Sequence, residues 1–268
     1  MKNIISIAKI TFLGGRRDKV FLTLIIISIL IFPLIIFAVS PLSMRQVREV
    51  AVSLSLSTIS IVLLVLAIFL SINLVYKDIE RRFTHSILSL PISRSSYLIG
   101  KFIGLASIIG VGIITLTIFS SIGIAIVDKM YTPNTVMSWT NFYAAIFFDY
   151  LSLLILASVS MAVSAISTNI FLPLFATIGV YIIGYISQTV YDYISSPKGG
   201  ELPIFIRKIS KAVYYIFPNF TLFDIKFKAI YNLPLTLDNV LNVAAYSLLY
   251  IVIILSIAIF AFRKREMV

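Results

Sequence analysis

The chain contains no cysteine and only one histidine, His85, among its 268 residues. Without cysteine it can form neither a disulfide framework nor a thiolate metal site, and a single imidazole cannot build a metal centre alone. The phosphate-binding pattern G-x-x-x-x-G-K-[ST] also does not occur in the sequence. The chain therefore cannot cradle a nucleotide in that way, and we expect no catalytic, metal or cofactor-binding residues on it.

Charged residues are scarce as well, at 12% of the chain, whereas 60% of the chain is hydrophobic. A water-soluble domain cannot bury so large an apolar fraction, and about 20 apolar residues suffice for one helix to cross a bilayer. Barrel strands would be short and alternating, so the spans should be helices. The sequence predicts an all-α integral membrane protein with six transmembrane helices, at about 20–39, 51–76, 97–127, 142–167, 171–193 and 241–262.

Two segments outside these spans are amphipathic rather than featureless. Residues 1–19 mix aliphatic positions with lysines and end in a Gly-Gly and basic cluster, which predicts an N-terminal interfacial helix. Residues 194–240, before the last span, carry one apolar and one basic helical face followed by an aromatic cluster, which predicts a structured outer loop. All of these parts are expected to form a single transmembrane domain over residues 1–268.

The net charge of +11 comes mostly from lysines and arginines at span ends and in loops. This distribution is typical of membrane orientation, so we attribute it to topology and expect no nucleic-acid partner. It predicts a multi-pass protein of the cell membrane with both termini cytoplasmic. The basic residues of the 194–240 loop, Arg207, Lys208 and Lys211 among them, are an exception to the positive-inside distribution.

Residues 77–96 form a charged, amphipathic interruption between two of the longest apolar runs. Ile79, Phe83, Ile87 and Leu90 recur at helical spacing on one stripe, with charged and polar residues on the remaining surface. Pro91 should end this helix. A short two-faced helix between two spans is suited to contact a soluble partner.

The sequence around this segment resembles the membrane subunits of ABC transporters of the ABC-2 type. The resemblance rests on the charged run after the second span, on Leu90 to Arg94 (Leu-Pro-Ile-Ser-Arg) and on the pair Gly100 and Lys101. In outline it extends over the whole chain and includes the element Phe217 to Asn219 (Phe-Pro-Asn). The chain departs from the family pattern in having Arg82 and Phe83 near the place of the family's usual glycine.

The resemblance implies a permease, expected to be an exporter, that forms the translocation path as a homodimer or heterodimer. Two copies of a separate ATP-binding-cassette subunit would drive it and would hold ATP and Mg²⁺, with membrane lipid as the other partner. The coupling helix would then lie in the 77–96 segment. The residues expected to contact the ATP-binding subunit are Asp78, Glu80, Arg81, Arg82, Phe83, His85, Ile87, Leu90, Pro91 and Arg94.

Polar residues inside the apolar runs are candidates for the translocation path. Asp149 is an ionisable group at depth, which is by default a functional hypothesis, and Asn73 and Gln188 are the accompanying amides. A secondary transporter or channel that uses Asp149 is therefore an alternative function. A membrane-embedded lipid enzyme is a further alternative, but such chemistry needs clustered acids or a His/Asp/Glu site, and the eleven acids are scattered.

One pair of small residues predicts a helix contact. Gly100 and Gly104 are four residues apart in the third predicted span, so both lie on one helix face. A face without side chains lets another helix approach closely.

Overall fold

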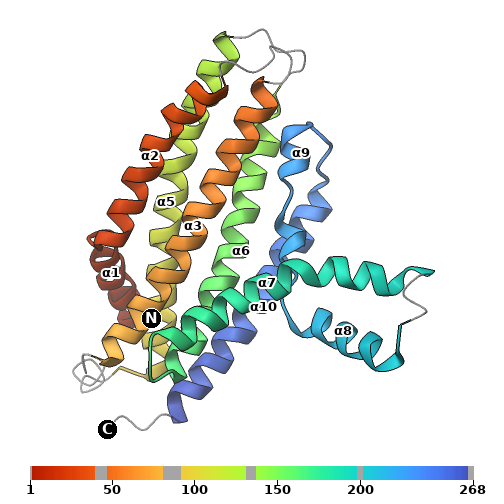
Figure 1. The fold of residues 1–268 in the computed structure, drawn as a ribbon. Helices are drawn as coiled ribbons and strands as arrows, with labels where there is room; N and C mark the ends of the chain where they lie inside the picture. The colour runs from red at the N-terminus through yellow and green to blue at the C-terminus, as the bar shows by residue number, and fades with distance from the viewer. Residues whose placement is uncertain (1, 40–46, 81–91, 131–136, 198–201, 265–268) are drawn as a thin grey trace.

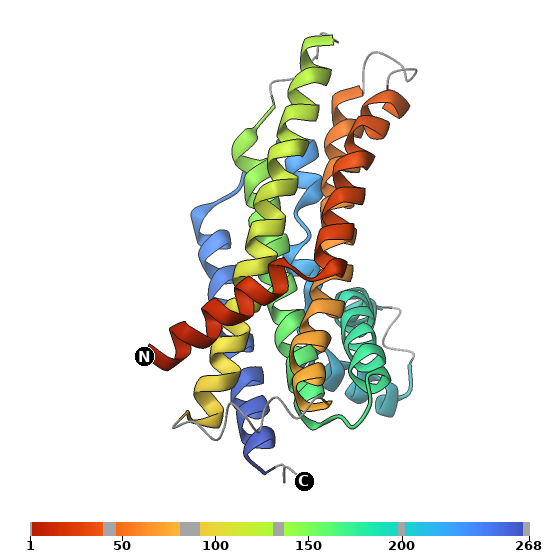
Figure 2. The ribbon, with the colours of Figure 1, turned by 90° about the vertical axis from the view of Figure 1, so that its left-hand side faces the viewer.

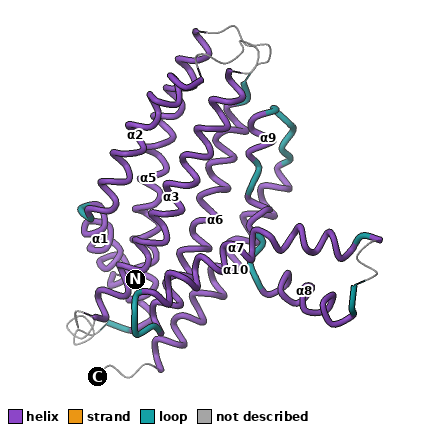
Figure 3. The backbone as a smooth tube through the Cα atoms, in the orientation of Figure 1, coloured by secondary structure: helices purple, strands orange, loops and turns teal. Residues whose placement is uncertain are grey.

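The computed structural model describes residues 2–39, 47–80, 92–130, 137–197 and 202–264. All regular structure in these residues is helical (Figure 3), which confirms the predicted all-α class. Helix is the conformation expected of apolar segments in lipid, because it satisfies the backbone polar groups within one segment.

The main bundle consists of long helices that run alongside one another (Figures 1 and 2). Its core lies between three of these helices, where residues such as Leu63, Leu105 and Ile155 are fully buried. The bundle helices are α2 (Lys19–Val39), α3 (Val47–Glu80), α5 (Arg94–Met130), α6 (Trp139–Ile166) and α10 (Leu237–Lys264).

Within the described residues, five helices are long and apolar enough to cross a membrane, judged by length and composition. They are α3, α5, α6, α10 and α7 (Phe171–Ser195). The remaining expected span corresponds to α2, which has 21 residues, although the apolar stretch over its described side chains is only Phe21–Phe32. Several apolar helices are thus confirmed, and the count of six spans stays a prediction.

The helix that packs against Gly100 and Gly104 is α1 (Lys2–Arg16), which lies obliquely across α5 (Figure 2). A Cβ atom added at Gly100 would lie 2.8 Å from the Cβ of Ile7. One added at Gly104 would lie 2.6 Å from the Cβ of Thr11 and 2.8 Å from the carbonyl oxygen of Ala8. The two glycines therefore provide the groove in which the amphipathic α1 rests.

Replacing Gly104 with leucine is expected to push α1 away from α5, because the nearest atoms include backbone of α1 that cannot rotate away. Overpacking of this kind typically costs about 1–3 kcal/mol. The measurement is thermal unfolding of the purified protein in detergent, with Gly14→Leu as control, because a Cβ at Gly14 meets no atom within 4 Å. Equal unfolding temperatures for the two variants would contradict the packing role of Gly104.

Two further helices, α7 and α8 (Ile204–Ile216), lie across the bundle instead of along it. Figure 1 shows that α7 begins near the lower end of α6 and runs across the bundle direction. Helix α8 returns beneath α7, so that the two helices project from one flank of the bundle. Although α7 has the composition of a span, only 22% of its most apolar window is buried. We refer to α7 and α8 together as the lateral arm.

The chain returns from the arm to the bundle through η2 (Phe220–Phe223) and α9 (Lys226–Ile230), which pack on α6. The predicted 194–240 loop is therefore structured over its described part. At its centre Asn219 is only 3% exposed and donates through Nδ2 to Gln188, 2.6 Å away. Asn219, Phe220 and Thr221 match the N-glycosylation pattern N-x-[ST], and the buried Asn219 makes this triplet part of the folded interior.

Candidate functional site

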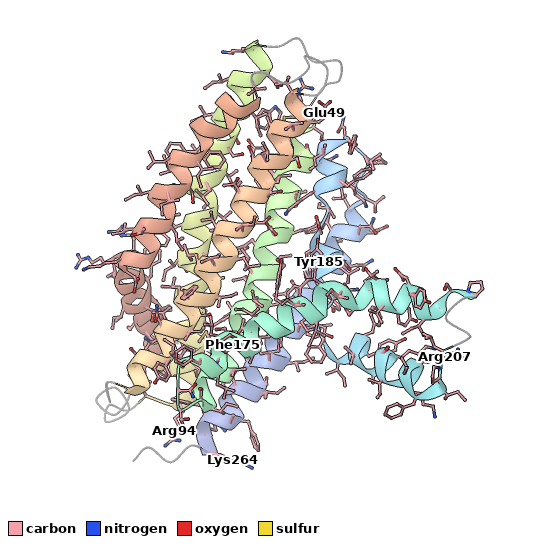
Figure 4. The ribbon with its side chains drawn as sticks, in the orientation of Figure 1. Glu49, Arg94, Phe175, Tyr185, Arg207 and Lys264 are labelled. Carbon is pink, nitrogen blue, oxygen red and sulfur yellow. The ribbon has the colours of Figure 1, made fainter. Side chains whose placement is uncertain are left out.

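The predicted coupling segment begins at the end of α3 and finishes at the start of α5. Figure 4 shows Arg94 at the same end of the bundle as Lys264, with Glu49 at the opposite end. Of the predicted contact residues, Asp78 and Arg94 have described side chains, and Glu80 is the last residue of α3. The others, Arg81, Arg82, Phe83, His85, Ile87, Leu90 and Pro91, lie outside the described residues, so their roles stay predictions.

A buried ion pair joins the two helices just inside this segment. Lys101 Nζ of α5 lies 2.5 Å from Asp78 Oδ2 of α3, and Tyr97 Oη donates to the same oxygen at 2.8 Å. Lys101 is only 7% exposed and also donates to the carbonyl of Leu74 at 3.2 Å. The amphipathic pattern predicted Asp78 as a surface contact, whereas the structure places its carboxylate mostly inside the helix junction.

Arg94 connects the start of α5 to the end of α10. Its Nη1 donates to the carbonyl oxygens of Phe262 and Arg263, at 3.1 and 2.9 Å. The last carbonyls of a helix lack partners within the helix and carry partial negative charge, so a guanidinium is well suited to cap them. Tyr97 stacks on Phe262 beside this contact, with ring centroids 5.9 Å apart.

A second ion pair joins the same two helices at the opposite end of the bundle. Arg48 Nε near the start of α3 lies 2.6 Å from Asp128 Oδ1 near the end of α5. Arg48 and Asp78 are 30 residues apart on one helix, which corresponds to about 45 Å. Two ion pairs at this separation hold α3 and α5 together as one unit, and the predicted coupling residues connect the two helices at the Asp78–Lys101 end.

Asp149, the predicted intramembrane acid, lies on α6 and contacts α3. The hydroxyl of Ser60 donates to Asp149 Oδ2, and α6 also packs against η2 and α9 of the returning segment. The acid is therefore hydrogen-bonded between two bundle helices, close to the segment that returns from the lateral arm.

The structure does not bring Asn73 and Gln188 to Asp149. Asn73 is on α3, 13 residues after Ser60 and therefore about 20 Å along the helix. Gln188 of α7 instead accepts hydrogen bonds from Tyr214 Oη at 3.1 Å and from Asn219. It fixes the lateral arm to the loop that follows, and a role of Asn73 and Gln188 in the translocation path stays a prediction.

Tyrosines reinforce this junction between the arm and the bundle. Tyr185 Oη of α7, labelled in Figure 4, donates to Asp224 Oδ2 at 2.5 Å. The backbone N–H of Asn219 donates to Tyr246 Oη of α10 at 2.8 Å. Hydrogen bonds between the polar groups of the junction thus connect α7, the returning loop and α10.

An apolar groove lies between α5 and α6, with a volume of about 470 Å³. Ile113, Ile114 and Phe147 contribute to its walls, as does Tyr150, whose hydroxyl donates to the carbonyl of Ala106. Its lining suits an acyl chain or another apolar group. Among the described residues, no group of three histidines or acids is placed to hold a metal ion.

Several of these contacts could not be inferred from the sequence. Arg94 and Phe262 are 168 residues apart, and Ser60 and Asp149 are 89 apart. Lys101 did offer a signal, since a lysine inside an apolar run requires a partner, but the sequence alone does not show that Asp78 supplies it.

The arrangement is therefore a membrane bundle whose paired helices α3 and α5 meet α1 and α10 at the end that carries the predicted coupling segment. A search of curated proteins finds no match to the chain. The family model described as ABC-2 family transporter protein matches residues 5–267. This match covers nearly all of the chain and agrees with the features around residues 77–101, and the chain accordingly belongs to the ABC-2 family of transporter proteins.

Proposed function

We propose that the chain is the transmembrane permease subunit of an ABC exporter, which works as a dimer and is driven by a separate ATP-binding subunit. The family supports a multi-pass membrane subunit, and permeases of this family generally work with ATP-binding subunits. The observation that carries the proposal is the connection of α3 and α5 by ion pairs at both ends, with the predicted coupling residues between the two helices.

The mechanism follows from this connection. Closure of the ATP-binding subunits would push on residues 77–96, and the Asp78–Lys101 pair would make α3 and α5 move together. Arg94 would transfer the same displacement to α10, and the glycine groove of α5 would transfer it to α1. ATP and Mg²⁺ would remain on the partner, and the termini would lie with the coupling segment on the cytoplasmic side.

A secondary transporter that uses Asp149 is the alternative supported by a specific observation. The Asp149–Ser60 hydrogen bond places an ionisable group between α3 and α6, where an ion could be exchanged. The two functions differ in their energy source, since the first requires ATP on a partner and the second requires an ion gradient only.

The proposal is tested by purifying the chain with an ATP-binding-cassette subunit from the same organism and measuring ATP hydrolysis in proteoliposomes. We expect the chain alone to be inactive and the complex to hydrolyse ATP. Phe83→Ala should weaken the complex about 30-fold, the loss typical of an aromatic anchor at an interface. Membrane insertion should be unchanged.

Lys129→Ala is the matched control, because this exposed lysine is in the last turn of α5, away from the coupling end. Its complex should have the affinity and the ATP hydrolysis rate of the unsubstituted chain. Uptake driven by an ion gradient without any ATP-binding subunit would favour the alternative function and exclude the proposed one.

A further inference from the structure

A second pocket, with a volume of about 460 Å³, lies between α6, the start of α10 and the segment that returns from the lateral arm. Figure 1 shows α9 of this segment beside the upper part of α6, above the lateral arm. One wall of the pocket is apolar and includes Phe148 of α6, Leu222 of η2 and Val243 of α10. The pocket is large enough to hold a small molecule.

The polar side chains of this pocket come from α9 and α10. Lys228 of α9 lines it together with Asn239 and Asn242 of α10, and Lys228 is the one charged residue among the described residues of the lining. Within the described part of the chain, the ammonium group of Lys228 and the two side-chain amides have no ion-pair or hydrogen-bond partner. An ammonium group and two amides with no carboxylate beside them in the described lining suit an anionic group.

The backbone that carries Lys228 is fixed by the start of α6. Asn141 of α6 is only 7% exposed, and its side-chain amide donates to the carbonyl oxygens of Lys228 and Leu233, at 3.3 and 2.8 Å. The backbone N–H of Leu233 also donates to the carbonyl of Lys228, at 3.0 Å. Asn232 closes the turn between them with a φ of 53°, which asparagine adopts more readily than most residues. This wall of the pocket is therefore organised before a ligand binds, which lowers the entropic cost of binding.

The pocket is at the level where α10 leaves the apolar layer of the membrane. Between Asp238 and Arg263 this helix carries no charged residue over about 36 Å, and its apolar residues include Leu248, which is 60% exposed. About 20 residues, the length that crosses the hydrocarbon core, counted back from Arg263 end at Val243. Val243 therefore lies near the membrane boundary away from the coupling segment, with the two asparagines at that boundary.

We propose that this pocket binds an anionic amphiphile, a molecule with a phosphate or carboxylate head and an alkyl chain. The head accepts hydrogen bonds from Lys228, Asn239 and Asn242, and the chain packs on the apolar wall. A molecule of this kind places its head at the membrane boundary, which is the level of these polar side chains. Anionic membrane lipids and single-chain amphiphiles share this chemistry. The site is independent of the ATP-driven function, because it requires no contact with an ATP-binding subunit.

The test uses the chain in phosphatidylcholine nanodiscs with Leu235→Cys, which is unique because the sequence contains no cysteine. Leu235 is a half-buried residue of the lining, so an occupied pocket should slow its reaction with N-ethylmaleimide. We expect dodecyl phosphate to protect this cysteine. With Lys228→Gln added, about tenfold more dodecyl phosphate should be needed, the loss expected when a hydrogen bond to a charged group is removed. Lys228→Arg keeps the charge and should keep the protection.

Two controls separate the pocket from the membrane surface around it. Leu237→Cys, at a position that is 80% exposed and outside the pocket lining, should react at the same rate with and without dodecyl phosphate. Lys129→Gln removes an exposed lysine of α5 and should leave the protection of Leu235→Cys unchanged.

The choice of probe decides the ligand class and its source. Protection by phosphatidylglycerol in the nanodisc identifies a membrane lipid, and protection by dodecyl phosphate without an effect of phosphatidylglycerol identifies a single-chain amphiphile. Either result supports the site. The proposal is overturned if dodecyl phosphate gives no protection or protects the Lys228→Gln variant equally well. Equal protection by uncharged dodecyl maltoside or by inorganic phosphate alone would also overturn it.

Discussion

Lys101→Met is expected to destabilise the bundle by about 3 kcal/mol and to abolish ATP-driven transport. Removing one member of a buried ion pair leaves the other charge uncompensated, at a typical cost of about 3–5 kcal/mol. The lower figure applies because Asp78 keeps its hydrogen bond from Tyr97 and its side chain is 19% exposed. Transport should fail because α3 and α5 would no longer move together at the coupling end.

The measurements are denaturant unfolding in detergent and transport in proteoliposomes. Adding Asp78→Asn to Lys101→Met should recover a large part of the stability, because the second change removes the unpaired charge. It should not restore transport, since the connection itself is still missing. Lys129→Met is the exposed control on the same helix. A Lys101→Met protein as stable as this control would contradict the role given to the ion pair.

Gly184→Val is expected to detach the lateral arm from the bundle. A Cβ at Gly184 would overlap the carbonyl oxygen of Pro218 and lie 2.7 Å from Cδ2 of Phe220. The carbonyl is backbone, so the loop must shift and Asn219 loses its hydrogen bonds to Gln188 and Tyr246. Overpacking and the unpaired polar groups together should cost about 3–5 kcal/mol.

Gly179→Val provides the control in the same helix, because a Cβ there meets no atom within 4 Å. Unfolding in detergent measures the stability, and limited proteolysis near residues 217–225 reports whether the loop has shifted. Gly184→Val should be cleaved faster than Gly179→Val. The same cleavage rate and stability in both variants would show that Gly184 has no such packing role.

The sequence predicts the helical class well, because the backbone of a long apolar run in lipid must satisfy its own hydrogen bonds and a helix does so within one segment. It also predicts the close helix contact at Gly100 and Gly104, although not that α1 makes it. The inclination of α7 could not be predicted. Its composition is that of a span, and its direction depends on distant contacts such as Tyr185 with Asp224.

The candidate site is less predictable than the fold for the same reason. Helical periodicity treats Asp78 as one of several surface charges, and only the folded bundle brings Lys101 and Tyr97 to it. Gln188 was a candidate for the translocation path because it is polar within an apolar run. Its hydrogen bonds to Tyr214 and Asn219 depend on the position of α8, which the pattern does not specify.

The ion pairs Arg48–Asp128 and Asp78–Lys101 give the α3–α5 unit the stiffness of a strut about 45 Å long. Turning such a strut by about 10° around one end would displace its far end sideways by roughly 8 Å, most of the width of a helix with its side chains. A small rotation at one end of the bundle would thus become a displacement of nearly a helix width at the other.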